Sequence, residues 1–231
     1  MHRRMLAAVI LVSAFVAASA SPARAQQSLT FNLGGFMPRG EDGRTKGDVL
    51  VVNRQYLLFS VADFNGFTVG GEWAIGLGEY FEAGIGVGYY QETVPAIYDE
   101  WVNLDGSEIQ QDLKLRIAPI TAIARILPLG KKRAFQPYVG AGLGIYSWRY
   151  SETGEFVDFS DNSIYRDSYV ASGTAVGPVA VFGARGRLGK SFSLGLEVRL
   201  QWGQADLSQD FLGDKLDLGG TSVLSTFTYR F

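Results

Sequence analysis

Apolar and polar residues alternate along most of the chain after residue 27, with the period of two that marks β-strands. In residues 192–202 every even position carries a large apolar side chain and every odd position a small or polar one. The same alternation occurs over residues 67–77 and 81–89. Each such strand therefore has one apolar face and one polar face. The pattern predicts eight strands, at residues 28–37, 66–77, 80–91, 111–127, 136–149, 172–187, 191–204 and 219–231.

The connections between the predicted strands alternate between long and short. By these limits they hold about 28, 2, 19, 8, 22, 3 and 14 residues. Long and short connections therefore fall at opposite ends of an up-and-down antiparallel meander. An even number of strands also returns the two ends of the chain to the same side.

Charged side chains occupy strand centres on the face opposite the apolar one. In a soluble β-sandwich the apolar face would form the core and these charges would face water. In a membrane barrel the polarity is inverted, so that apolar side chains meet lipid and charges fill the lumen. Because a buried ion without a partner is costly, the acids and bases are expected to pair there. The predicted lumen network comprises Glu72, Glu82, Lys114, Arg116, Arg185, Glu197, Arg199 and Arg230.

Three features favour the membrane barrel over the sandwich. The apolar run of each clear strand is about nine to eleven residues, the length that crosses a bilayer at a tilt. The chain ends on the alternating aromatic residues Phe227, Tyr229 and Phe231. Aromatic residues also gather near strand ends, as the interfacial girdles of a membrane barrel require. These are Tyr80, Phe81, Tyr89, Tyr90, Trp148, Trp202, Tyr229 and Phe231.

The beginning of the chain has the features of a secretory signal. Two arginines precede an apolar run over residues 5–18, and a small-residue cleavage motif follows at residues 23–25. The predicted organisation is a cleavable signal peptide over residues 1–25 and a barrel domain over residues 26–231. No later stretch approaches the ~18 apolar residues that a membrane-spanning helix needs.

The aromatic C-terminus, the leader and the alternation of long and short connections occur together in this chain. In this combination the chain resembles the small eight-stranded outer-membrane β-barrels of the OmpA, OmpX and opacity-protein type. The resemblance covers residues 26–231. It implies a monomer in outer-membrane lipid, with short periplasmic turns, long extracellular loops and both termini in the periplasm. It also implies that Phe227, Tyr229 and Phe231 form the signal read by the barrel assembly machinery.

Composition narrows the possible functions. The chain has 231 residues, with no Cys, one His and 29 Gly. The absence of Cys excludes a small domain held together by disulfides. Of the 21 basic residues three leave with the leader, so 18 bases face 23 acids, a charge that disfavours nucleic-acid binding. Eighteen of the acids, but only six of those bases, lie in the four long connections, and a nineteenth acid, Asp112, borders one of them. The long connections therefore form an acidic surface.

One acidic outer loop is a candidate interaction surface. Residues 92–112 contain six acids and no base. Clustered carboxylates suit hard cations such as Ca²⁺, so this loop could bind a divalent cation or an extracellular partner, or could simply be solvated. It has no EF-hand spacing. The residues singled out are Asp99, Glu100, Trp101 and Asp105.

Residues 48–59 are too apolar for a free loop. With Asp48 as N-cap, this segment could form a short helix at the outer interface or over the barrel mouth. It could equally extend a strand above the membrane.

Two glycine series, at positions 84, 86 and 88 and at positions 140, 142 and 144, fall on the lumen face. Their missing side chains leave room either for large neighbours such as Tyr138 and Tyr146 or for a cavity. The first alternative predicts a plugged, structural or surface-interacting barrel that serves envelope integrity or adhesion. The second predicts a narrow pore, or a conduit for a small apolar molecule.

Catalysis is disfavoured. The only histidine is His2, inside the leader, whereas the enzymes that resemble this chain in being outer-membrane barrels use a His. General-base catalysis near neutral pH without His would need a strongly perturbed carboxylate or Lys. The sequence contains no phosphate loop and no zinc motif, so we expect no cofactor, no metal site and no lipid-modifying activity.

Overall fold

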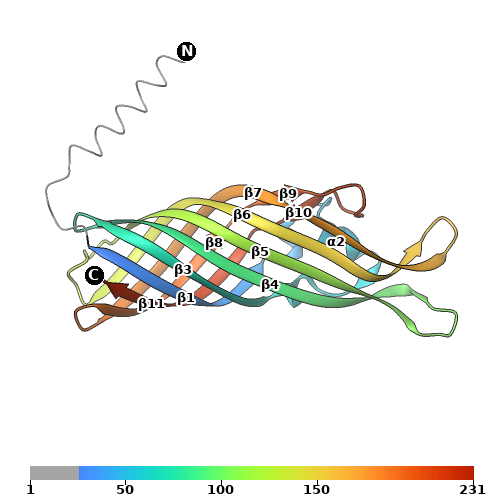
Figure 1. The fold of residues 1–231 in the computed structure, drawn as a ribbon, viewed down its shortest axis with the longest axis horizontal. Helices are drawn as coiled ribbons and strands as arrows, with labels where there is room; N and C mark the ends of the chain where they lie inside the picture. The colour runs from blue at the N-terminus through green and yellow to red at the C-terminus, as the bar shows by residue number, and fades with distance from the viewer. Residues whose placement is uncertain (1–25) are drawn as a thin grey trace, which may run out of the picture.

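The computed structural model describes residues 26–231, and its main feature is one antiparallel sheet closed into a barrel (Figure 1). The strands follow the order β4-β3-β1-β11-β8-β7-β6-β5, and pairing of β4 with β5 closes the ring. The predicted eight-stranded up-and-down barrel is therefore confirmed. The signal peptide predicted at residues 1–25 lies outside the described residues. The eight strands are β1 (Gln27–Pro38), β3 (Gly66–Leu77), β4 (Phe81–Val102), β5 (Glu108–Ile126), β6 (Phe135–Asp158), β7 (Ser163–Leu188), β8 (Phe192–Gln201) and β11 (Gly220–Arg230).

The first and last strands complete the ring. β1 pairs with β11 from Ser28 opposite Arg230 to Pro38 opposite Gly220. This closure removes the free edges at which sheets aggregate. Both ends of the described chain lie at the same end of the barrel, away from the tips of the longest hairpins (Figure 1).

Two hairpins extend far beyond the predicted strand limits. The β4–β5 pair continues to Val102 opposite Glu108, and the β6–β7 pair to Asp158 opposite Ser163. The predicted connections of about 19 and 22 residues are therefore wrong, because only residues 103–107 and 159–162 link these strands. The backbone ladder persists where the alternation of side chains fades, since its hydrogen bonds do not depend on an apolar face.

The outer surface of the barrel is apolar over a band that matches a bilayer. Leu196, Val176 and Leu143 are 65%, 64% and 61% exposed. On β5 the outward-facing positions are apolar throughout residues 118–126, about the length of strand that crosses a bilayer. A continuous apolar exterior is unsuited to water and suits hydrocarbon.

Aromatic side chains flank this band at both ends. Phe81, Phe135, Phe192, Tyr229 and Phe231 are exposed near the end that carries the termini, and Phe67, Tyr89 and Trp202 are exposed near the other end. The assignment of Tyr90 and Trp148 to these girdles was wrong. Both side chains point into the barrel and are only 2% and 4% exposed, because they occupy inward positions of their strands.

The first and last long connections fold over the mouth of the barrel at the end opposite the termini (Figure 1). The first contains η1 (Glu41–Gly43), α2 (Val49–Asn53), β2 (Leu57–Leu58) and η2 (Val61–Phe64), and the last contains the pair β9 (Gln204–Asp206) and β10 (Lys215–Asp217). Within residues 26–231, no helix has the length and apolar character needed to cross a membrane.

The hydrophobic core lies inside the half of the barrel farther from the termini rather than along the whole length of the barrel. Leu50 of α2 and Phe64 of η2 are fully buried, and they belong to the same cluster as Leu115, Tyr146 and Tyr150 of the barrel wall. The two connections are therefore packed elements of the fold.

Candidate functional site: the lumen and its cover

An ion-pair cluster occupies the middle of the lumen. Arg125 of β5 forms a two-pronged ion pair with Glu72 of β3, and its Nη2 atom lies 3.1 Å from Glu197 Oε2. Arg199 Nη2 lies 2.7 Å from Glu197 Oε1. The Tyr138 hydroxyl donates to Glu197 Oε2 at 3.0 Å, and its ring centroid is 5.4 Å from the Arg125 guanidinium. The charges are thus paired at a level of the barrel that water hardly reaches.

A second polar cluster lies nearer the termini. Arg185 Nη2 pairs with Glu82 Oε1 at 2.5 Å, and Arg185 Nε donates to Gln136 Oε1 at 2.9 Å. Arg230 Nη2 donates to the same amide oxygen at 2.7 Å. Of the predicted lumen residues, Glu72, Glu82, Arg185, Glu197, Arg199 and Arg230 therefore lie inside the barrel.

Lys114 and Arg116 are not lumen residues. Inward positions of β5 are odd-numbered, so both side chains project from the outer wall, where they line a groove with Arg149 of β6. The same parity places Arg125 inside, as the central cation that the sequence analysis missed. The sequence does contain a signal for Arg125. Residues 114 and 125 are an odd number of positions apart on one continuous ladder, so their side chains must lie on opposite faces of the strand.

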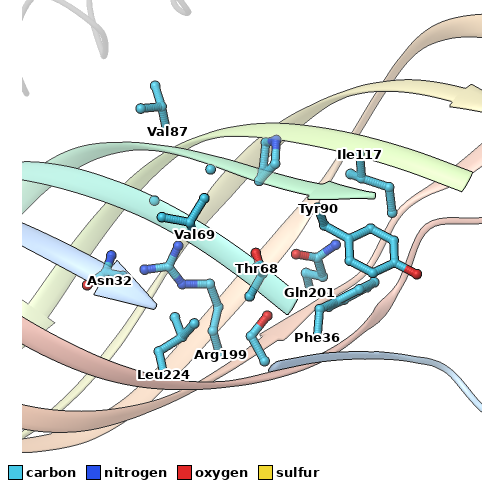
Figure 2. Close-up of a pocket in the computed structure, with 14 residues that line it drawn as sticks. Asn32, Phe36, Thr68, Val69, Val87, Tyr90, Ile117, Arg199, Gln201 and Leu224 are labelled. Carbon is cyan, nitrogen blue, oxygen red and sulfur yellow. The ribbon is translucent and has the colours of Figure 1, made fainter. Parts of the chain in front are cut away.

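Little open space remains beside these clusters. A cavity of about 10 Å³ adjoins Glu72, Arg125 and Glu197. A second cavity has a volume of about 30 Å³. Arg199, Phe36 and Tyr90 are among the side chains that line it (Figure 2). Since one water needs about 10–15 Å³, these cavities hold a few water molecules at most.

The lumen-facing glycines make room for their neighbours. A Cβ atom at Gly84 would lie 2.9 Å from Glu72 Oε1, and one at Gly144 would lie 2.6 Å from the Tyr146 hydroxyl. At Gly142 a Cβ atom would collide with a backbone carbonyl of β5. Side chains and backbone thus occupy the space that these glycines leave.

The cover of the mouth is held by a buried ion pair. Both carboxylate oxygens of Asp48 accept from Arg44 Nη1 at 2.9 Å, and the two side chains are fully buried. Asp48 also caps α2 by accepting from Leu50 N at 3.0 Å. Both alternatives for residues 48–59 are realised in part, because a helix over the mouth is followed by the short strand β2, which pairs with β4.

Asp48 also joins the two connections to each other. Its Oδ2 atom accepts from Asp217 N at 2.6 Å, and the Asp217 carboxylate pairs with Arg39 at 3.0 Å. Lys215 N donates to Gly47 O at 3.1 Å. The cover is therefore one hydrogen-bonded unit built from segments about 170 residues apart in the sequence.

The predicted acidic outer loop is the tip of the β4–β5 hairpin. Asp99, Glu100 and Asp105 are exposed, whereas Trp101 is half-buried, with its ring 6.2 Å from that of Phe159. Ser107 donates to the Asp105 carboxylate through its N–H and its hydroxyl, which holds the pKa of Asp105 below its usual value. Within residues 26–231 no three acidic or histidine side chains are grouped as a metal site would require, and binding of a cation or an extracellular partner by this loop stays a prediction.

The C-terminal aromatic residues form a line on the outer wall. Phe227, Tyr229 and Phe231 all face outward, and the ring of Phe192 lies 5.6 Å from Phe227 and 5.3 Å from Tyr229. Their recognition during assembly stays a prediction.

No protein-family model matches the chain, and no curated protein matches it significantly. Among solved structures, the chain is similar to the N-terminal β-barrel domain of Pseudomonas aeruginosa OprF, with 11% identity over 89% of this chain and 97% of that one and a TM-score of 0.45. It is also similar to Neisserial surface protein A, with 10% identity over 89% of this chain and 97% of that one and a TM-score of 0.47. A major outer membrane protein from Thermus thermophilus is similar as well, with 13% identity over 90% of this chain and 99% of that one and a TM-score of 0.47. Its own closed ring of eight antiparallel strands, apolar outside and ionised inside, gives the chain the architecture of the small outer-membrane β-barrels.

Proposed function

We propose that this chain is a closed, non-conducting outer-membrane barrel with a structural or surface-interacting role, serving envelope integrity or adhesion. The observation that carries the proposal is obstruction at two levels. The ion pairs of Arg125 and Arg199 fill the middle of the lumen, and the cover held by Asp48 fills its outer mouth. An ion crossing the barrel would have to disrupt both.

The proposed orientation places both termini in the periplasm and the long hairpins outside the cell. Of the 23 acids, 18 lie in the four long connections of the predicted pattern and Asp112 borders one of them, whereas the short turns carry the basic run at residues 131–133. Just beyond the apolar band, Lys114, Arg116 and Arg149 face outward around one polar groove. We infer that these cations contact lipid phosphates at the outer surface of the bilayer.

A monomer needs no partner to complete this fold, because the ring is closed within one chain. We propose that the barrel assembly machinery recognises the line of Phe227, Tyr229 and Phe231. We also propose a non-catalytic role, since the only histidine of the sequence is His2, which lies in the predicted signal peptide.

The second candidate function is a narrow pore or a conduit for a small apolar molecule. The lumen-facing glycines are the observation that favours it. Filling of their space by Glu72 and Tyr146 argues against it.

Planar-bilayer recording of the refolded protein tests the proposed function. We expect no stable unitary conductance, because the ion pairs and the cover obstruct the lumen at two levels. A known porin reconstituted in the same way serves as the positive control. Reproducible unitary steps from this protein, at a protein-to-lipid ratio that gives single insertions, would replace the closed barrel with the pore.

A further inference from the structure

A cleft of about 350 Å³ opens above the cover, between the extended hairpins and the first and last connections. Small-molecule sites commonly measure about 300–1,000 Å³, so the cleft has room for a compact ligand. Its walls carry six aromatic rings and three carboxylates, and no lysine or arginine lines it. These side chains are Tyr56, Tyr98, Phe156, Phe159, Tyr165, Tyr169, Glu152, Asp158 and Asp210.

The floor of the cleft holds a carboxylate without a cation. Glu152 of β6 is 5% exposed, and its Oε1 atom accepts from Asn53 Nδ2 at 2.6 Å and from the Tyr150 hydroxyl at 2.9 Å. No lysine or arginine within residues 26–231 forms an ion pair with it. Burial accordingly raises the pKa of Glu152 above its ordinary value. A buried carboxylate in this condition is stabilised by any cation that reaches it.

Two further acceptors on the floor have unused capacity. Asn53 and Gln111 are 1% and 3% exposed, and both line the cleft. Within the described part of the chain, Asn53 Oδ1 and Gln111 Oε1 have no hydrogen-bond partner. An unsatisfied buried acceptor is unfavourable, and a ligand that brings N–H donors would satisfy it. Asn53 already donates to Glu152, whereas Gln111 donates to the Tyr98 hydroxyl and to the Glu155 carbonyl. The free acceptor of Gln111 is therefore an observation separate from the Glu152 carboxylate, and it points to the same kind of ligand.

The walls of the cleft present aromatic faces. The ring of Phe156 stacks on that of Tyr165 at 5.7 Å and meets that of Tyr169 edge to face at 4.9 Å. The hydroxyls of the two tyrosines are 3.1 Å apart, and the ring of Tyr56 lies 5.1 Å from that of Phe159. The negative faces of such rings attract cations.

We propose that this cleft binds a small organic cation that carries N–H donors, an alkylammonium or a guanidinium, with its charge on Glu152 and its chain between the tyrosines. A bare metal ion fits poorly, because it needs several oxygen ligands at once and no such group exists within residues 26–231. A neutral sugar would leave the Glu152 charge uncompensated. The proposal goes beyond the closed barrel and does not depend on it, since the cleft lies outside the lumen.

Isothermal titration of the refolded protein in uncharged detergent tests this site with three probes: agmatine, cadaverine and, as a neutral comparator of matching chain length, pentanediol. We expect agmatine or cadaverine to bind one per chain, and pentanediol to bind at least about tenfold more weakly. Glu152→Gln, which keeps an acceptor oxygen but removes the charge, should weaken the cation at least about tenfold. Tyr165→Ala should weaken it about three- to fivefold.

Glu100→Gln is the matched control, because Glu100 is exposed on the neighbouring hairpin and does not line the cleft. Its affinity for the cations should equal that of the parent. Each variant is first checked for the heat-dependent gel shift of a folded barrel. Equal binding of the cations and pentanediol, no loss in folded Glu152→Gln, or no binding by either cation would overturn the proposal, whatever the bilayer recordings show.

Discussion

Replacement of Arg125 by methionine is expected to lower the free energy of unfolding of the barrel by about 3–5 kcal/mol. Arg125 is 5% exposed and is the shared partner of Glu72 and Glu197. Its loss leaves two carboxylates close together in a space that water barely enters. Methionine preserves much of the side-chain volume, so the effect reports the charge. Urea unfolding in zwitterionic lipid vesicles, followed by tryptophan fluorescence, measures it.

Arg116→Met is the matched control, since it makes the same chemical change on the same strand but on the outer wall. It should change the unfolding free energy by no more than about 0.5 kcal/mol. Adding Glu72→Gln and Glu197→Gln to Arg125→Met should restore much of the loss, because the buried charges then disappear together. Equal destabilisation by the two arginine variants would refute the assignment of Arg125 to the lumen.

Asp48→Ala should release the cover while leaving the barrel folded. The substitution uncaps α2, breaks the bond to Asp217 N and leaves the guanidinium of Arg44 buried without its partner. We expect the free energy that holds the cover closed to fall by about 3 kcal/mol. This raises the population of the open cover, and hence the rate at which it is cleaved, about a hundredfold. Trypsin digestion measures this, since Lys46 and Arg54 flank the helix.

Asp42→Ala is the control for this experiment, because Asp42 is exposed in the same connection and its side chain forms no ion pair within residues 26–231. Its trypsin cleavage should proceed at the rate of the parent. The heat-dependent gel shift should persist in both variants, showing that the strands remain paired. If Asp48→Ala were cleaved no faster than Asp42→Ala, the buried pair would not be what holds the cover.

The sequence predicts the barrel well because the bilayer imposes a simple pattern on it. Within the apolar band every second residue meets lipid, and the limits of β3 match the predicted strand at residues 66–77. Beyond the band this constraint ends. The β6–β7 hairpin continues to Asp158 with its ladder intact, yet its side chains no longer alternate clearly, so its length was underestimated.

The lumen network was predicted in part for a related reason. On β5 both faces near the centre are apolar, because Ala122 and Ala124 face lipid while Ile123 faces inward. Lys114 and Arg116 therefore led to the wrong prediction that the even-numbered side chains of β5 face the lumen, which left Arg125 out of the predicted network. Arg125 is the charged residue that lies deepest in the apolar band of β5, and its odd number indicates that the odd-numbered side chains face the lumen. Lys114 and Arg116 lie at the edge of the band and do not indicate which face is inward.

The cover and the outer cleft depend on contacts that no local pattern records. Asp48 meets Asp217, and Asn53 meets Glu152, across separations of 169 and 99 residues. The sequence indicated an N-cap at Asp48 and a helix after it. It could not indicate which strand ends would surround that helix.

The inverted polarity of the barrel is tested most directly by the depth of single labels in a bilayer. The chain has no cysteine, so Leu196→Cys and Gln110→Cys each offer one site for a fluorophore, the first in the apolar band and the second on the exposed outer part of β5. We predict that lipids brominated on their acyl chains quench the label at position 196 strongly and the label at position 110 weakly, and that a water-soluble quencher gives the reverse order. A label at position 196 that only the water-soluble quencher reaches, or that neither quencher reaches, would contradict an apolar exterior in lipid.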